Sequence, residues 1–340
     1  MTALQYDWSR PPTTKERARL GGRLGRLDVP GLAPHLEGIN NALLAYQRPA
    51  GKLLSLGLRT RHEFSCRTTP IPGDGSDRKA PPRELRPPAT RISSSQGSAL
   101  RLQLIAMALL QLHRKPGTKA RLADLEIPIA GSSKQTGWAD LVAAQPTDSN
   151  RGGVFITSRD KRARTVRKAL ATLEGAGLVD VPGPSGKRNR FEGFVLLHEA
   201  GVDAFGEHQE YATPAVSESA FVMPAGFVLN SWLHVLEDSE ISVLLMAACR
   251  RRSWSDDGLW AFPGAVRLQH YGIHRDSYSA ARKTLEWLGL LKIREIGRHD
   301  DGRAEDDERL LHRIGLDPAG FEHPALPTMQ NMIRGQLARG

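Results

Sequence analysis

The chain has 340 residues, of which 40% are hydrophobic and 25% are charged. This length predicts two or three domains, and the apolar fraction excludes wholesale disorder. No apolar stretch reaches the roughly 18 residues that a transmembrane helix requires, so we expect no membrane span. The formal net charge of +10 favours a polyanionic partner.

Two further features of the sequence bear on the compartment. Cys66 and Cys249 are the only cysteines, which excludes a disulfide framework and a four-cysteine zinc site. The sequence from Met1 to Leu20 has no apolar core of an export signal. We therefore expect a cytoplasmic protein, associated with the nucleoid or with a plasmid, and no membrane partner.

The positive charge is concentrated in the first part of the chain. Residues 1–97 and 98–200 carry net charges of +8 and +7, whereas residues 201–340 carry −5. A polyanion would therefore bind the first two of these segments more readily than the third.

Residues 1–97 have the composition of a basic, largely flexible arm. They contain 11 of the 22 prolines, and the stretch from Thr68 to Ser98 has almost no apolar residues. Such a stretch buries too little surface to offset the entropy of ordering, so we expect a linker there. Ile39, Leu43, Leu44 and Tyr46 recur at helical spacing and predict one helix in the arm, over residues 38–48.

Residues 98–200 begin with a helix that is apolar on most of its surface, from Ala99 to Leu112, and Pro116 ends it. Short helices are expected near Leu122–Leu125 and Trp138–Ala143, and a strand near Val154–Thr157. A second long helix begins at a Ser158 or Asp160 cap and ends at Gly177. Strands at Leu178–Val181 and Phe191–Leu197 follow, joined by a polar hairpin tip.

Residues 220–317 repeat this scheme. A helix is predicted to begin after an Asp238 or Ser239 cap. Two further helices follow at Pro263–Tyr271 and Asp276–Leu288. Strands at Leu290–Ile296 and Glu308–Gly315 flank an acidic loop.

The two segments superpose at a constant offset of 112 residues, which pairs Val166 with Tyr278, Ala169 with Ala281, Leu173 with Leu285, Gly177 with Gly289 and Leu178 with Leu290. In both, a helix ending in the pattern L-E-x-x-G-L runs into a predicted β-hairpin. This pattern resembles the winged helix-turn-helix superfamily. The resemblance implies an α+β, predominantly helical fold with two winged-helix domains in tandem, at residues 98–200 and 220–317. A Pro/Gly-rich basic arm (1–97) precedes them, a linker (201–219) joins them, and a tail (318–340) follows.

The first copy carries the charge that a DNA reader needs. In a winged helix, the helix before the hairpin enters the major groove and the hairpin contacts phosphates. No acidic residue occurs from Lys161 to Leu173, whereas an ordinary solvated face would interleave acids with the bases. We expect the helix to contact DNA through Arg159, Lys161, Arg162, Arg164, Thr165, Arg167 and Lys168, and the hairpin through Lys187, Arg188 and Arg190.

The second copy is less suited to DNA. Its outward helix positions, expected to be Arg275, Ser277, Ser279, Arg282 and Lys283, are candidate DNA contacts that carry less positive charge than those of the first copy. Its hairpin loop is acidic and would be repelled by phosphates. This copy therefore either holds its hairpin clear of DNA or mainly binds protein, including a second copy of the chain in a homodimer.

Enzyme signatures are absent from the sequence. The segment Gly183–Lys187 lacks the spacing of a phosphate-binding loop, and Gly272 interrupts the pair His270 and His274. We expect no enzymatic activity, no metal and no cofactor.

The predicted function is therefore sequence-specific binding of double-stranded DNA. The tandem arrangement resembles plasmid replication initiators, which bind origin repeats through two winged helices. That resemblance implies monomeric or dimeric binding at repeats and recruitment of host replication proteins. The alternatives are a transcriptional regulator of the same build, with host transcription proteins as partners, and a scaffold that binds only proteins.

Overall fold

The fold is α+β and predominantly helical, as expected from the sequence. The computed structural model describes residues 9–72, 80–94, 98–142, 149–151, 154–187, 189–201, 207–251, 258–294 and 312–339. The expected acidic loop 297–307 and Arg188 lie outside these residues.

The N-terminal segment is built of short elements: α1 (Thr14–Leu27), α2 (Leu32–Ala45), α3 (Leu53–Leu56), β1 (Leu58–Arg61), α4 (His62–Ser65), η1 (Arg83–Leu85) and α5 (Pro88–Ile92). The predicted helix at 38–48 is the second half of α2, which ends at Ala45.

The middle of the chain forms the first unit: α6 (Ala99–His113), η2 (Leu122–Leu125), α7 (Trp138–Val142), β2 (Ser149–Arg151), β3 (Val154–Ile156), α8 (Ser158–Gly175), β4 (Val179–Asp180) and β5 (Val195–Leu196). These elements confirm the helices expected in residues 98–200, whereas the expected strands Leu178–Val181 and Phe191–Leu197 are reduced to the two-residue strands β4 and β5. From Ala99 to Leu112, every residue of α6 except Arg101 is buried, as its apolar sequence predicts.

The rest of the chain forms the second unit and its flanks: β6 (Ala220–Met223), α9 (Gly226–Leu229), α10 (Trp232–Val235), α11 (Asp238–Cys249), β7 (Trp260–Ala261), α12 (Gly264–Tyr271), α13 (Arg275–Trp287), β8 (Leu291–Arg294), β9 (Arg313–Leu316), η3 (Pro318–Glu322) and α14 (Ala325–Leu337). The strands β7, β9 and β8 form one antiparallel sheet, in that spatial order.

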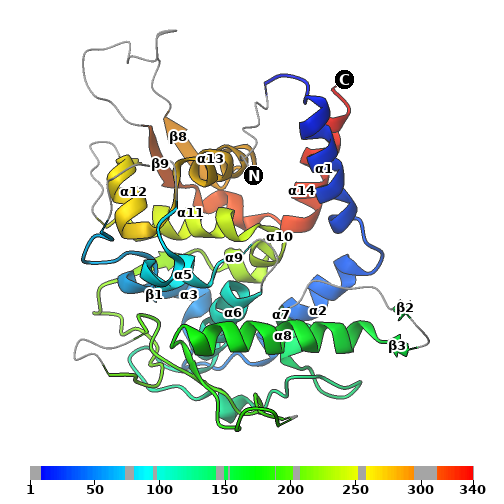
Figure 1. The fold of residues 1–340 in the computed structure, drawn as a ribbon, viewed down its shortest axis with the longest axis vertical. Coiled ribbons are helices and arrows are strands. Elements are labelled where there is room, and N and C mark those ends of the chain that lie inside the picture. Colours follow the sequence, from blue (N-terminus) through cyan, green and yellow to red (C-terminus); the bar gives the residue numbers. More distant parts are fainter. Residues whose placement is uncertain are drawn as a thin grey trace.

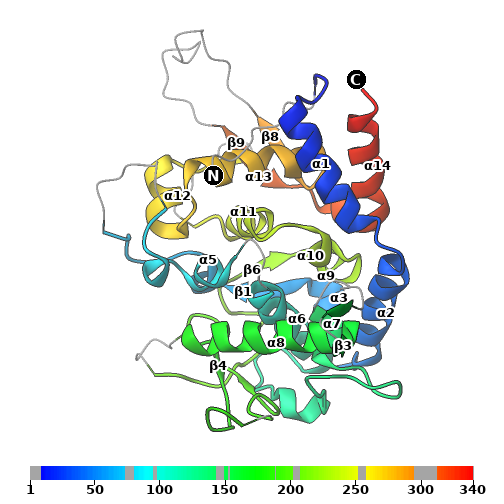
Figure 2. The ribbon, with the colours of Figure 1, turned by 45° about the vertical axis from the view of Figure 1, so that its right-hand side comes forward.

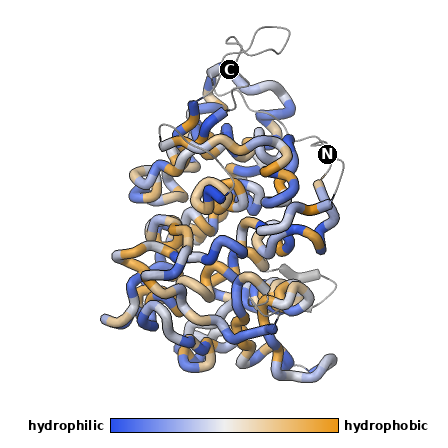
Figure 3. The backbone as a smooth tube through the Cα atoms, turned by 90° about the vertical axis from the view of Figure 1, so that its left-hand side faces the viewer, coloured by the Kyte–Doolittle hydropathy of each residue, from blue (hydrophilic) through white to orange (hydrophobic). Residues whose placement is uncertain are grey.

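The molecule is elongated, and its ends carry different elements (Figure 1). α8 lies near one end of the long axis, whereas α13, β8, β9 and the paired helices α1 and α14 lie toward the other (Figures 1 and 2). Hydrophobic residues occur along the whole length of the molecule in Figure 3, and the buried ones form one continuous cluster. The two units therefore share a core.

The expectation of a flexible arm at residues 1–97 is wrong for the described part of that segment. Leu36, Ile39, Leu43, Leu53 and Phe64 are all buried in the shared core. Within the expected linker, residues 80–94 contain the short helices η1 and α5. The Thr90 hydroxyl of α5 donates a hydrogen bond to the Tyr271 carbonyl at 2.9 Å. Ile39 and Leu43 belong to the helix that was predicted, whereas the short apolar groups around Leu53 and Phe64 were missed because prolines and arginines surround them.

The N-terminal segment is also joined to the body by strand pairing. β1 pairs antiparallel with β6, with Leu58 opposite Met223 and Arg61 opposite Ala220. The end of the expected linker 201–219 is incorporated as well, since Leu197 pairs with Glu210 and Lys119 with Ala212. We call the pair β1–β6 the central seam.

A buried ion pair lies at this seam. Arg61 contacts Glu199 at 2.7 Å, and these side chains are 10% and 0% exposed. Arg61 also pairs with Glu218 and donates to the Ala212 carbonyl at 3.0 Å. The Arg61 backbone N–H donates to the other Glu199 oxygen at 3.1 Å. The pair thus links the N-terminal segment, the end of the first unit and the segment that follows it.

The two helices that match at the 112-residue offset end in the same way. Gly177 and Gly289 both have left-handed φ values, 67° and 70°, which glycine adopts without strain. The following residues donate to the same place in each helix, Leu178 to Leu173 and Leu290 to Leu285, both at 2.9 Å. This is the Schellman arrangement.

Two helices begin at other cap residues than expected. Thr157 caps α8, where Ser158 or Asp160 was expected, and Glu237 caps α11, where Asp238 or Ser239 was expected.

Within the described residues, no helix has the combined length and apolar character needed to cross a membrane.

Replacing Glu199 by glutamine should destabilise the fold strongly. Removing one partner of a buried pair costs up to about 3–5 kcal/mol, and here it leaves Arg61 with only the partly exposed carboxylate of Glu218. Urea denaturation of Glu199→Gln should show this loss in the free energy of unfolding. Glu210→Gln is the matched control, because its partner Arg121 is 67% exposed and such pairs contribute at most about 1 kcal/mol. Equal effects of the two changes would contradict the buried role of Glu199.

The pH dependence of stability should carry the signature of His234. This side chain is buried in α10, and within the described residues neither ring nitrogen has a hydrogen-bond partner. Burial, reinforced by the charges of Arg101 and His35, lowers the pKa of His234 to about 3.

The direction of this pH dependence follows from proton binding by the His234 ring. The unfolded chain takes up a proton near pH 6.5 and the folded chain does not, so stability is lost as pH falls from 6.5 toward 3. At pH 5 the loss amounts to about 2 kcal/mol. His234→Phe should flatten the pH dependence of unfolding in this window, and an unchanged slope would contradict the assignment.

Candidate nucleic-acid interface

α8 is held in place by one apolar face. Val166, Ala169, Leu170 and Leu173 are buried in the core, and the helix packs on α6 and α7. Thr157 caps the first turn by accepting from the Asp160 N–H at 3.1 Å. The helix is thus fixed at both ends and along one side, which leaves the other side to solvent.

The outer side of α8 is cationic. Arg164 and Lys168 are exposed, and Arg167 beside them is half-buried. No ion pair of these three side chains occurs within the described residues. Arg159 and Lys161, also half-buried, lie one turn earlier on the helix. We call Arg164, Arg167 and Lys168 the outer cations.

Arg162 is not on this outer side, contrary to expectation. Its side chain is 9% exposed and pairs with Asp140 of α7 at 2.9 Å. Asp140 also accepts from the Gly137 N–H at 3.1 Å. Arg162 precedes Val166 by four residues, so helical spacing places it on the buried face. Its role is to fix α8 against α7.

Thr165 is half-buried, and its hydroxyl donates to the Lys161 carbonyl of its own helix at 3.1 Å. This bond occupies the hydroxyl proton and leaves an oxygen lone pair as the side chain's remaining polar site.

The hairpin after α8 is only partly as expected. β4 and β5 pair antiparallel, and Lys187 in the connecting turn is exposed. Arg190 instead turns back onto the fold: it pairs with Glu174 of α8 and lies over the Phe191 ring at 5.1 Å. Gly183 approaches the Arg190 backbone so closely that a Cβ would lie 2.5 Å from its Cα. The close approach of Gly183 and Arg190 closes the hairpin, and the pair of Arg190 with Glu174 attaches it to α8.

The corresponding helix of the second unit offers less positive charge. Arg282, expected to point outward, is 4% exposed and occupies the position of Leu170 in the first unit. Arg275 is exposed, while Ser277, Ser279 and Lys283 are half-buried. The Ser277 hydroxyl lies 3.4 Å from the His274 ring. At the 112-residue offset, the outer cations correspond to Asp276, Ser279 and Ala280.

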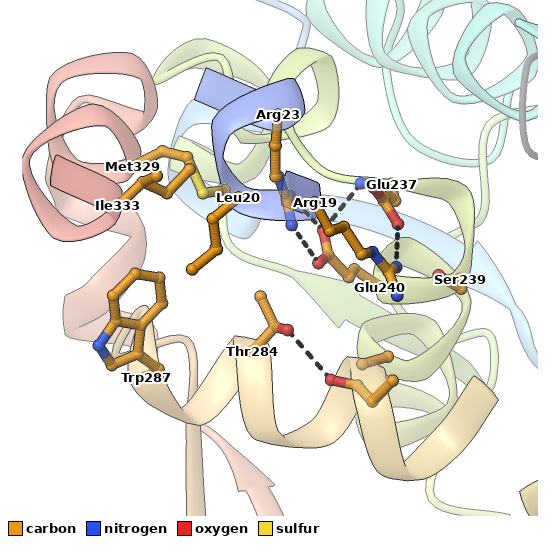
Figure 4. A pocket seen from close by; sticks show the side chains of 12 residues that line it. Arg19, Leu20, Arg23, Glu237, Ser239, Glu240, Thr284, Trp287, Met329 and Ile333 are labelled. Carbon is orange, nitrogen blue, oxygen red and sulfur yellow. Dashed lines mark hydrogen bonds and ion pairs between the residues drawn. The ribbon is translucent and has the colours of Figure 1, made fainter. Parts of the chain in front are cut away.

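α13 is also partly enclosed. α1 and α14 lie across one of its sides and form a small pocket with it, lined by Leu20, Ala280, Thr284, Trp287 and Met329 among others (Figure 4). Next to the pocket, Arg23 of α1 binds both carboxylate oxygens of Glu240 at 2.7 Å. Ala280, the counterpart of Lys168, is therefore beneath α1 instead of on a free surface.

The described part of the chain contains no group of three or more histidine, cysteine, aspartate or glutamate side chains that could hold a metal ion. Tyr278 is 8% exposed and packs in the core as expected. Cys249, also buried, lies 3.2 Å from the His62 ring, and burial raises the pKa of its thiol.

Comparison of the chain with protein-family models, with curated proteins and with solved structures gave no match.

Proposed function

We propose that this chain is a sequence-specific double-stranded DNA-binding protein built from two winged helix-turn-helix units. The order α11, β7, α12, α13, β8, β9, with the sheet order β7-β9-β8, supports this assignment for the second unit. The order α6, α7, α8, β4, β5 supports it for the first, as do the matching Schellman ends of α8 and α13. In this fold the helix before the hairpin is the reading helix.

The observation that carries the proposal is the outer side of α8. A helix held on one face by Val166 and Leu173 presents the outer cations away from the core. Arginine reads guanine through its O6 and N7 acceptors, and lysine neutralises phosphate. Lys187 on the hairpin adds a charge that can reach the backbone beside the groove.

The two units have different roles in this proposal. α8 reads the major groove, and the second unit, whose α13 lacks counterparts of the outer cations, serves assembly, including a homodimer. Binding at repeated sites of a plasmid or mobile-element origin is the role that this division favours, with host replication proteins as partners. The same reading surface would serve a transcriptional regulator. Either role would place the protein on the nucleoid or on a plasmid.

Removing the outer cations should weaken DNA binding. The variant Arg164→Gln/Arg167→Gln/Lys168→Gln removes the charges while keeping residues of good helix propensity. With a duplex selected by the wild-type protein from a random pool, affinity should fall by about 5- to 150-fold for each lost base contact, which corresponds to about 1–3 kcal/mol. Fluorescence anisotropy over a salt series should show a shallower slope, by about 0.9 for each lost phosphate contact.

The matched control is Arg275→Gln/Lys283→Gln on α13, for which we expect only a small change in affinity. Unchanged binding by the α8 variant, or an equal loss in the α13 variant, would contradict the assigned reading helix. Failure of the wild-type protein to select any duplex would favour a protein-binding scaffold.

A further inference from the structure

A cavity of about 350 Å³ opens on the first unit, between η2, α7 and the turn that leads into β5. Leu122, Ile127, Trp138 and Phe194 supply apolar lining, and the Trp138 and Phe194 rings pack with their centroids 5.3 Å apart. Cavities that bind small molecules have volumes of about 300–1,000 Å³ and mostly apolar walls. The α7 cavity, as we call it, therefore has the size and the walls of a site for a small ligand.

The charged lining of the α7 cavity is acidic. Glu126 and Glu192 line it, and among the described residues no lysine or arginine does. The surrounding sequence has the opposite character, because residues 98–200 carry a net charge of +7. The basic residues next in sequence to the lining, Arg121 and Lys134, are exposed and lie outside the cavity. The α7 cavity is therefore a negative site on a positive unit.

Both carboxylates are carried by segments that the fold holds in place. One oxygen of Glu192 accepts from the Ile129 backbone N–H at 3.1 Å, and within the described residues the other oxygen has no partner. Glu126 has a left-handed φ of 49°, which non-glycine residues adopt only at a cost. The Gln135 side-chain amide donates to the Glu126 carbonyl at 2.7 Å and so braces this turn. The chain thus keeps a carboxylate at a position that glycine would occupy without strain.

This lining is suited to a small organic cation. A carboxylate accepts charge-assisted hydrogen bonds from the N–H groups of an ammonium ion. Aromatic rings attract the same charge and also pack against an apolar body. A calcium ion would need about six to eight oxygen ligands, which two carboxylates among apolar walls do not provide.

We propose that the α7 cavity is a binding site for a small organic ammonium ion. The charged nitrogen binds the second oxygen of Glu192, with Glu126 adding negative charge, and the apolar body packs against Trp138 and Phe194. This inference goes beyond the proposed function and does not rest on it, because it concerns a small molecule and not DNA.

The α7 cavity lies between two supports of α8. On one side, Asp140 of α7 pairs with Arg162 of α8 at 2.9 Å. On the other side, the hairpin is attached to α8 through the pair of Arg190 with Glu174. A ligand that contacts α7 and the hairpin together binds the folded chain and not the unfolded one. It should therefore raise the melting temperature.

The test uses full-length protein without DNA, isotope-labelled at its tryptophan indoles, and three probes that share one apolar body. At neutral pH phenethylamine is a cation, phenethyl alcohol is neutral and phenylacetate is an anion. We expect phenethylamine to shift the indole N–H resonance of Trp138 in a saturable way, and to bind at least about tenfold more tightly than phenethyl alcohol. Phenylacetate should not bind. The variant Trp138→Phe identifies the resonance by its loss.

The variant Glu192→Gln removes the charge and keeps an acceptor for the Ile129 N–H. We expect its affinity for phenethylamine to fall about tenfold, while its affinity for phenethyl alcohol and its melting temperature stay near those of the wild type. Glu126→Gln, at an exposed position, should lower the affinity for the amine as well. The matched control is Asp124→Asn, which removes an exposed charge of η2 outside the cavity and should leave the affinity unchanged.

Three results would overturn the inference: an unmoved Trp138 resonance at the highest soluble concentration of phenethylamine, equal affinities for the amine and the alcohol, or an equal loss of affinity in Asp124→Asn. Because DNA is absent from this titration, none of these results bears on the proposed function, which the α8 variant tests separately.

Discussion

The central seam is the constraint on which the rest of the structure depends. β1 comes from the N-terminal segment and β6 from the start of the second unit, and their pairing is accompanied by the buried contact of Arg61 with Glu199. Burial of a charge is tolerated only when it is paired and hydrogen-bonded, and Glu199 accepts from both the side chain and the backbone of Arg61. This requirement fixes the end of the first unit against the N-terminal segment, and so fixes the frame that supports α8.

The N-terminal segment also gives the two units different surroundings. The N-terminal segment continues past the seam to α1, which pairs with α14 and lies across one side of α13. No described element lies over the outer side of α8 in the same way, and Arg164 and Lys168 remain exposed there. Two segments with matching apolar positions thus come to have different surfaces, because their outward residues differ and because α1 and α14 pack on only one of them. This asymmetry underlies our proposal that α8 reads DNA and that the second unit serves assembly.

Much of the secondary structure follows from the sequence. The apolar run of α6, the L-E-x-x-G-L endings of α8 and α13, and the strands after them were all predictable, because hydrophobic spacing and glycine conformation act locally. The order of the N-terminal segment was not predictable from composition. Leu53 and Phe64 belong to α3 and α4, helices of four residues each that are too short to give a periodic signal, and these helices pack on α6 and α11, which lie far along the chain.

Among the candidate site residues, position on the helix was a better guide than charge. Arg162 and Arg282 are buried, although both were expected outside, and spacing from Val166 would have placed Arg162 inward. The inward turn of Arg190 depends on Glu174, which lies on a different element, so no local pattern predicts it. α1 was not predicted, although the Thr13–Glu16 capping box and the spacing of Leu20, Leu24 and Leu27 are signals of an amphipathic helix.

Protection of guanine N7 from methylation tests the central claim most directly, because this atom lies in the major groove where α8 is proposed to bind. On the duplex selected by the wild-type protein, the account predicts protected guanines that become reactive with Arg164→Gln and stay protected with Arg275→Gln. Guanines that are equally reactive with and without wild-type protein, or a protection pattern that is lost only with Arg275→Gln, would contradict it.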